Sequence, residues 1–166
     1  MGFPVFLLSL TGESDELLVT TLSSSYSLGD KLVIGMSKAG NTAKQIKVGT
    51  RLAVNFLADK EQLISDIAGF VNSHQREELL AKNGANFSVF NGVTYLEEAL
   101  ISIIAKVIQI VTDEHYLHVF LTIESRLIAS DDIDFQTFHP LLYVGDDKIR
   151  YYKKTTNNIA KSGSML

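Results

Sequence analysis

Two long apolar runs in the second half of the chain restrict the fold most strongly. In ALISIIAKVIQIV (99–111), seven of thirteen residues are isoleucine or valine, and β-branched side chains favour a strand over a helix. After a turn expected at 112–114, YLHVFLTIESRLIA (116–129) continues in the same way. Long antiparallel strands usually close into a barrel, because closure removes exposed strand edges. The two runs therefore predict a β-barrel.

The first half of the chain contains four shorter apolar runs that read as strands. They are PVFLLSL (4–10), ELLVTTL (16–22), KLVIGMS (31–37) and RLAVNFL (51–57). The turn-rich TGESD between the first two predicts a hairpin. A second hairpin is expected near the end of the chain, where LLYV (141–144) and KIRYY (148–152) flank a Gly-Asp-Asp turn.

Helices are expected between the strands. A short helix with an N-cap near Asn41 or Thr42 closes at Gly49. The apolar residues of DKEQLISDIAGFVNS (59–73) have the spacing of one helical face, and REELLAKNG (76–84) predicts another helical turn or two. The chain is thus mainly β, with about eight strands and two or three helical insertions.

The composition fits one domain and excludes several kinds of site. The chain has 166 residues, 46% of them hydrophobic, which is enough for a real core over 1–154, followed by a flexible tail over 155–166. The absence of cysteine excludes disulfides, thiolate zinc sites and a cysteine nucleophile. It is also compatible with the cytoplasm, where we expect the protein.

Neither nucleic acid nor a membrane is an expected partner. The fifteen lysine and arginine residues are scattered and the net charge is −4, which argues against a nucleic-acid groove. The longest strongly apolar stretch, 99–105, is too short to span a bilayer. The apolar N-terminus lacks a basic leader, so we expect it to form the first strand and not a signal peptide.

No group of side chains predicts metal or nucleophilic chemistry. His115 and His118 lie three residues apart in an expected strand, so they point to opposite faces and cannot form a close metal pair. The serines of 23–27 have neither the G-x-S-x-G nor the S-x-x-K setting of a nucleophile. We therefore expect no metal site.

Two hydroxyl-rich clusters are the best candidates for a ligand site. In TTLSSSYS (20–27) seven of eight side chains carry a hydroxyl, and SKAGNT (37–42) follows one strand later. Hydroxyls, loop amides and a helix start supply donors for phosphate and ribityl groups, and Lys38 adds a positive charge. The alternative is that the first cluster is a solvated edge strand and the second an ordinary helix cap.

The order of these segments resembles that of the flavin reductase-like family, whose fold is an FMN-binding split barrel. SYSLGDKLVIGMSKAGNTAKQIKVGTRLAVNFL (25–57) is similar to its S-x-S-L, L-V strand, threonine loop, helix and F-x-V-N-x-L strand. DEHYLHVFLTIESRLI (113–128) resembles its G-D-H segment and long strand, and PLLYVGDDKIRYY (140–152) its closing hairpin. The resemblance extends to about residue 153 and implies an antiparallel split β-barrel.

The resemblance also implies a cofactor site for FMN. Four residues of the first cluster would lie along the flavin: Thr20, Thr21, Leu22 and Ser23. Four residues of the second would hold its phosphate: Ser37, Lys38, Asn41 and Thr42. His115 matches the histidine of G-D-H.

The activity that the resemblance implies is that of an NAD(P)H-dependent flavin oxidoreductase. Hydride would pass from the nicotinamide C4 to the flavin N5, and no side-chain acid or base is needed for that step. The resemblance further implies a homodimer with the flavin near the subunit interface. Two alternatives stay open: an FMN-binding electron carrier without pyridine-nucleotide activity, and a small barrel that acts as an interaction module without flavin.

Overall fold

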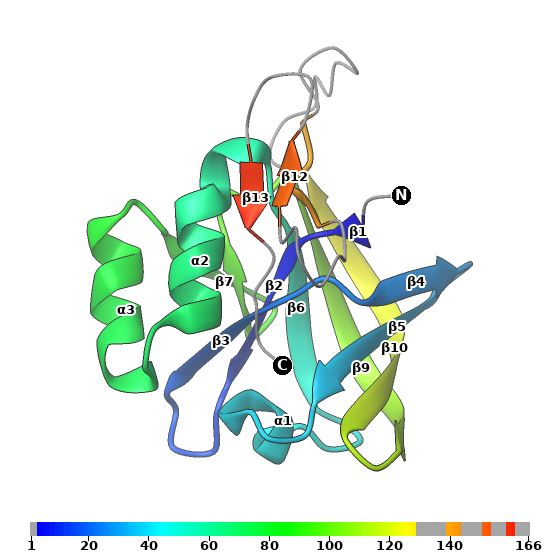
Figure 1. Cartoon of the computed structure of the whole chain (residues 1–166). Helices are drawn as coiled ribbons and strands as arrows, with labels where there is room; N and C mark the ends of the chain where they lie inside the picture. Colours follow the sequence, from blue (N-terminus) through cyan, green and yellow to red (C-terminus); the bar gives the residue numbers. More distant parts are fainter. Residues whose placement is uncertain (1–2, 129–138, 144–150, 154–158, 162–166) are drawn as a thin grey trace.

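The computed structural model describes residues 3–128, 139–143, 151–153 and 159–161. Its main feature is one antiparallel seven-stranded sheet in the order β3-β2-β6-β9-β10-β5-β4 (Figure 1). The strands of this sheet are β2 (Phe6–Thr11), β3 (Leu17–Leu22), β4 (Ser25–Leu28), β5 (Lys31–Ser37), β6 (Arg51–Phe56), β9 (Ile101–Thr112) and β10 (Tyr116–Ile128). The two β-branched runs form β9 and β10, which pair along almost their whole length.

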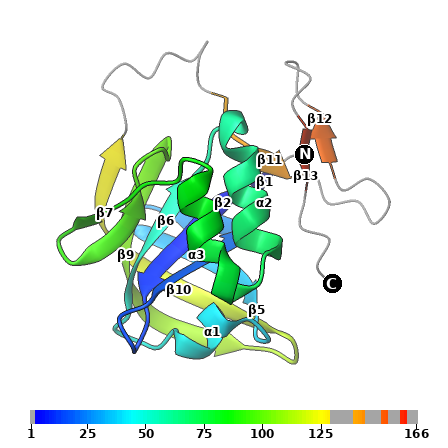
Figure 2. The same ribbon diagram turned by 90° about the vertical axis from the view of Figure 1, so that its left-hand side faces the viewer.

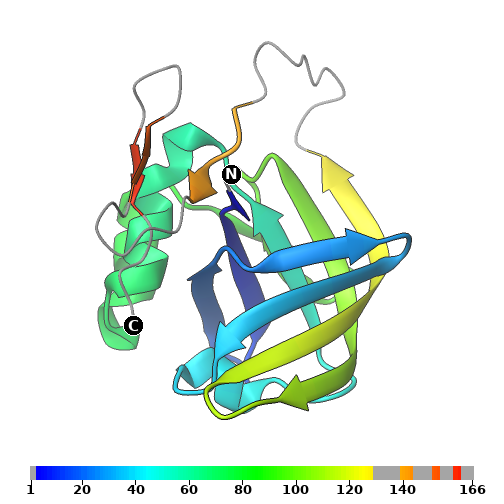
Figure 3. The same cartoon turned by 45° about the vertical axis from the view of Figure 1, so that its right-hand side comes forward.

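The sheet is curled into a barrel whose two edge strands follow each other in the sequence. β3 runs on into β4 through residues 23–24, and this stretch crosses the open side of the sheet (Figure 3). The amide of Gly35 on β5 donates to the carbonyl of Ser24 at 2.9 Å, which extends the β4–β5 pairing toward β3. The predicted antiparallel split barrel is confirmed.

Strand periodicity separates the core of the barrel from its outer surface. In β10 the buried Leu117, Val119 and Leu121 alternate with more exposed neighbours, as expected for a sheet with one buried face. Side chains from all strands of the barrel except β4 fill its interior, among them Leu8, Leu10, Leu32, Ile34, Leu52, Val54 and Val107.

A helical segment covers one outer face of the barrel. It consists of a 3-10 helix (η1, Asp59–Glu61), α2 (Gln62–Phe70) and α3 (Ser73–Lys82), and the two α-helices lie together on one side of the barrel (Figure 2). A second core lies under them, where Leu7 and Val19 of the sheet meet Ile64, Ile67 and Leu80 of the helices.

The chain between β6 and β9 leaves the sheet and returns to it at one point. It contains the helical segment and residues 83–100, and its neighbours in the sheet, Phe56 at the end of β6 and Ile101 at the start of β9, are partners in the β6–β9 register. The amide of Leu100 donates to the carbonyl of Phe56 at 2.9 Å.

The helix boundaries differ from the prediction for local reasons. α1 (Asn41–Gln45) has Gly40 as its N-cap, without a side-chain cap, so the N-cap expected at Asn41 or Thr42 is wrong. The helix ends early, at Gln45, because the buried Ile46 adopts an extended backbone that holds it in the barrel core. α3 begins at Ser73 instead of 76, where the Asn72 side chain accepts from the amide of His74.

One hairpin was not predicted. β7 (Phe87–Phe90) and β8 (Val93–Leu96) pair across Asn91 and Gly92, whose φ angles are 49° and 78°. Asn-Gly is the preferred sequence of a two-residue hairpin turn with two left-handed residues. The signal for this hairpin was therefore present in the sequence.

The predicted closing hairpin pairs differently within the described residues. β11 (Leu142–Tyr143) pairs with β1 (Phe3–Pro4), and β12 (Tyr151–Lys153) pairs with β13 (Ile159–Lys161). The expected Gly-Asp-Asp turn lies outside the described residues. β13 falls within the stretch expected as a tail, and the flexibility of 155–166 stays a prediction.

Candidate functional site

β5 brings the first hydroxyl cluster close to the start of the second. Thr20, Thr21 and Leu22 lie on β3, and Ser23 lies in the connection to β4. The main chain of Ser24 then pairs with Gly35 of β5, two residues before Ser37 begins the second cluster. The two clusters therefore lie near each other across the split in the sheet.

The hydroxyl groups of the first cluster have different surroundings. Thr21 Oγ1 donates to the carbonyl of Ser65 at 2.6 Å and so ties β3 to α2. Gly69 on the same helix lies against this threonine, since a Cβ there would be 3.4 Å from Thr21 Cβ, at the edge of ordinary van der Waals contact. Thr20 and Ser23 are half-buried and make no side-chain hydrogen bond within the described part of the chain.

The loop of the second cluster is fastened to the β9–β10 turn. Lys38 Nζ donates to the carbonyl of Asp113 at 2.8 Å, and the Lys38 amide donates to the carbonyl of His115 at 3.0 Å. Ser37 Oγ accepts from the amide of Ala39 at 3.3 Å. Lys38 therefore holds the loop in place, and one of its ammonium donors is directed at the turn.

The β9–β10 turn is organised by Asp113. Its carboxylate accepts from the amides of Tyr116 (2.7 Å) and His115 (2.8 Å) and lies 3.2 Å from His118 Nε2. These contacts, in that order, lower the pKa of Asp113 to about 2. His115 lies in the turn, before β10, so the expectation that both histidines lie in one strand is wrong. Among the described residues no group of three His, Cys, Asp or Glu side chains is placed to hold a metal ion.

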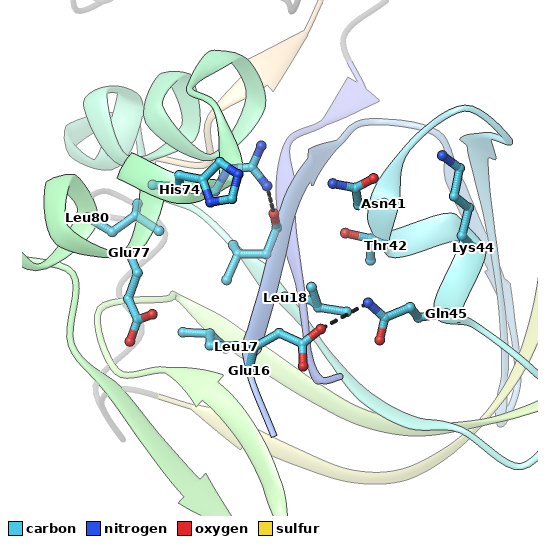
Figure 4. A pocket seen from close by; sticks show the side chains of 12 residues that line it. Glu16, Leu17, Leu18, Asn41, Thr42, Lys44, Gln45, His74, Glu77 and Leu80 are labelled. Atoms are coloured by element: carbon cyan, nitrogen blue, oxygen red, sulfur yellow. Dashed lines mark hydrogen bonds between the residues drawn. The ribbon is translucent and has the colours of Figure 1, made fainter. Parts of the chain in front are cut away.

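A cavity of about 400 Å³ lies between β3, α1 and α3 (Figure 4). This volume is within the range of about 300–1,000 Å³ that is typical of small-molecule sites. The cavity is lined by Glu16, Leu17, Leu18, Val19, Asn41, Thr42, Lys44, Gln45, His74, Arg76, Glu77 and Leu80. Two of the eight predicted site residues, Asn41 and Thr42, belong to this lining. The other six, Thr20, Thr21, Leu22, Ser23, Ser37 and Lys38, do not.

Thr42 and Arg76 supply hydrogen-bond donors to the cavity wall. Thr42 is only 4% exposed, and its hydroxyl makes no hydrogen bond within the described residues. The guanidinium of Arg76 donates to the carbonyls of Val19 (2.6 Å) and Val71 (2.7 and 3.1 Å). Burial lowers the pKa of Arg76. Sequence reasoning missed Arg76, because a single arginine in a polar helix carries no signal of its own.

The charged side chains of the cavity are separated along its length. Figure 4 places Asn41, Lys44 and His74 toward one end and Glu16 and Glu77 toward the other. Gln45 Nε2 donates to Glu16 Oε1 at 3.0 Å, and this bond is the main cause of the lowered pKa of Glu16.

Helix α1 is too short to act as a dipole. It has five residues, and its N-cap carries no side-chain bond. Attraction of an anion to this loop would therefore come from individual amides and side chains and not from a helix terminus.

Within the described residues no helix is both long and apolar enough to cross a membrane.

Solved structures share the fold of this chain. Flavoredoxin from Methanosarcina acetivorans has a TM-score of 0.73 at 16% identity over 99% of this chain and 87% of its own. The flavin reductase of styrene monooxygenase from Pseudomonas putida S12 has a TM-score of 0.69 at 14% identity, over 86% of each chain. The NADH:FAD oxidoreductase of Streptomyces globisporus C-1027, in complex with NAD and FAD fragments, has a TM-score of 0.69 at 10% identity over 86% of this chain and 81% of its own.

The chain has the flavin reductase-like split-barrel fold. No protein-family model and no curated protein sequence matches it. The likeness covers more than four fifths of each compared chain. The fold implied by the order of the sequence segments is thereby confirmed.

Proposed function

We propose that the protein is an FMN-binding oxidoreductase of the flavin reductase type that uses NAD(P)H. The observation that carries this proposal is the likeness of its fold to flavin reductases over at least 86% of the chain. One of the similar structures is named an NADH:FAD oxidoreductase and holds NAD and FAD fragments, which supports a nicotinamide nucleotide as the reductant.

The two hydroxyl clusters form the proposed flavin site. The ring and ribityl chain would lie along Thr20, Thr21, Leu22 and Ser23, and the phosphate would be held by the loop with Ser37, Lys38, Asn41 and Thr42. The hydroxyls of Thr42, Thr20 and Ser23 make no bond with any other described residue, which fits this use because phosphate and ribityl oxygens are hydrogen-bonding groups. The hydroxyl of Thr21 is already bonded to Ser65, so this residue would contribute its position and its methyl group.

The residues of the site bind and orient, and none has to move a proton. A bound flavin supplies the hydride acceptor, and the protein supplies its position and surroundings. Lys38 keeps the phosphate loop against the β9–β10 turn through its amide and its ammonium group. Leu17 and Leu18 line the cavity beside this loop and give it an apolar surface.

We also propose that the protein is a homodimer in the cytoplasm. β4 is an edge strand of the sheet and carries the exposed side chains of Tyr26 and Leu28. Unpaired strand edges and exposed apolar side chains favour association, and a second copy would cover them. Sedimentation analysis of the purified protein tests this proposal, which a monomer at all concentrations contradicts.

An electron carrier is the second candidate function. One structure that matches 99% of this chain is named flavoredoxin. As a carrier, the present protein would take electrons from another protein and not from NAD(P)H. The visible absorption spectrum of the protein with added FMN, before and after anaerobic addition of NADH or NADPH, separates the candidates. Bound flavin that bleaches supports a reductase, and bound flavin that stays oxidised supports a carrier. Absence of bound flavin would overturn both.

A further inference from the structure

Arg76 brings a positive charge into the wall of the cavity without an acidic partner. It forms no ion pair within the part of the chain that the structure describes. Its three printed hydrogen bonds go to main-chain carbonyls of Val19 on β3 and Val71 after α2. An arginine has five N–H donors, so two of them are left for a ligand.

The guanidinium group is fixed before any ligand binds. Its contacts with two different elements hold the planar fork in one orientation, and a fork that is already oriented loses little entropy when it binds a further oxygen. Arginine matches the geometry of phosphate oxygens with paired N–H groups. An anion that enters the cavity would therefore find a rigid, charged donor on its α3 side.

Thr42 supplies a donor from the opposite wall. The residue is 4% exposed and lines the same cavity from α1, and its hydroxyl has no hydrogen-bond partner among the described residues. The Thr42 hydroxyl is not among the fully buried polar atoms of the described residues, so it meets the space of the cavity and can bond to a ligand oxygen there. The observation is independent of Arg76, because it concerns another element and another kind of group.

The remaining titratable groups of the cavity indicate where an anion binds. Its lining contains Glu16, Glu77, Lys44 and His74 besides Arg76. The two carboxylates lie toward one end and Lys44 and His74 toward the other (Figure 4). Glu16 is further occupied by its bond with Gln45. An anion is therefore repelled from the carboxylate end and attracted to the end that holds the basic groups.

We propose that Arg76 and Thr42 together bind the phosphate group of the flavin, and that Arg76 makes the site prefer FMN over riboflavin. This inference rests on the proposed function. Arg76 binds the carbonyl of Val19, and Thr20 to Ser23 follow directly along β3 and beyond it. At roughly 3.3 Å per residue, this stretch gives about 13 Å for the ribityl chain and ring.

Titration of flavin fluorescence with FMN and with riboflavin tests the proposal. We expect the wild type to bind FMN at least about tenfold more tightly than riboflavin, because a phosphate forms charge-assisted bonds with arginine. Arg76→Gln should remove most of this preference by weakening FMN binding alone. Arg76→Lys keeps the charge without the fork and should lie between the two. Arg51→Gln, which changes an arginine paired with Glu124 on the barrel, is the matched control.

A second variant separates a ligand contact from a structural role. Thr42→Val removes the hydroxyl with little change of shape and should also weaken the binding of FMN and leave that of riboflavin unchanged. The inference would be overturned if Arg76→Gln lost affinity for FMN and riboflavin equally while Thr42→Val lost affinity for neither. Equal affinity of the wild type for both flavins would also overturn it. If the wild type binds neither flavin, the proposed function itself fails.

Discussion

The side-chain oxygen of Asn55 accepts a hydrogen bond of 2.8 Å from the hydroxyl of Ser102, across the pair β6–β9. The same oxygen accepts from the amide of Leu96 at 3.0 Å, and the Asn55 amide group donates to the carbonyl of Leu7 and the hydroxyl of Ser9, both at 2.9 Å. The asparagine side chain is fully buried. A single amide thus joins β2, β6, β8 and β9.

Replacing Asn55 with leucine should destabilise the fold strongly. The change leaves buried donors and acceptors of three strands without a partner, so we expect a loss of about 2–4 kcal/mol in the free energy of unfolding. Urea unfolding measures it. Ser102→Ala removes one of these bonds and should cost about 1 kcal/mol. A loss below that of Ser102→Ala in the Asn55 variant would show that water replaces the network.

Removing the charge of Asp113 should lower the stability of the folded protein only above the acid pH range. Its contacts with two amides and His118 place its folded-state pKa at about 2, below the ordinary value of 3.8. The carboxylate therefore contributes stability above pH 3.8, and this contribution is lost as the pH falls toward 2. Asp113→Asn should lower the melting temperature at neutral pH, and its melting temperature should approach that of the wild type as the pH falls toward 2. Glu114→Gln, in the same turn, is the control, and an equal effect of both variants would contradict the prediction.

The contribution of Glu61 to the stability of the fold should have the opposite pH dependence. Burial raises its pKa above the ordinary value of 4.5, although it accepts from the amide of Ala58 at 2.9 Å and lies 3.5 Å from Lys60 Nζ. A raised pKa means that the stabilising form is protonated, so the contribution of Glu61 is present below pH 4.5 and is lost as the pH rises through the folded-state pKa. Glu61→Gln should gain stability relative to the wild type between acid and neutral pH. Urea midpoints measure the difference, and a constant offset would refute it.

Replacing Lys38 should affect the order of the loop over 37–42 more than the affinity for FMN. Because its ammonium donates to Asp113 and its amide to His115, we expect Lys38→Ala to speed hydrogen exchange of the loop and to weaken FMN binding less than Thr42→Ala. The double variant should bind FMN at least about tenfold more weakly, through lost bonds worth roughly 1.5–3 kcal/mol to a charged acceptor. Unchanged FMN affinity in the double variant would mean that the phosphate lies elsewhere.

The sequence predicted the barrel because its strands carry their own signal. The β-branched residues of 99–111 form β9, and the period of two in β10 places Leu117 and Val119 in the core. The hairpin at Asn91 and Gly92 had an equally clear turn signal and was missed because each of its strands is only four residues long. The end of α1 depends on where Ile46 packs, which only the tertiary structure decides.

The site was predictable only in its local parts. Asn41 and Thr42 belong to a segment whose resemblance to a known pattern covers a continuous stretch of chain, and both line the cavity. Arg76 meets Val19 from a position 57 residues away, through the packing of α3 on β3. Nothing near Arg76 in the sequence distinguishes it from an ordinary surface arginine of a polar helix.

Because the chain between β6 and β9 returns to its starting point, its loops can vary in length. Because Phe56 and Leu100 are bonded to each other, the intervening residues close a loop whose ends the sheet already holds. Doubling the length of such a loop costs only about 0.6 kcal/mol in closure entropy. Insertions in the loops of the segment that carries Arg76 are therefore inexpensive, provided that they leave its core against the sheet and the bond between Leu96 and Asn55 in place. The choice of ligand can thus drift while the scaffold is inherited unchanged.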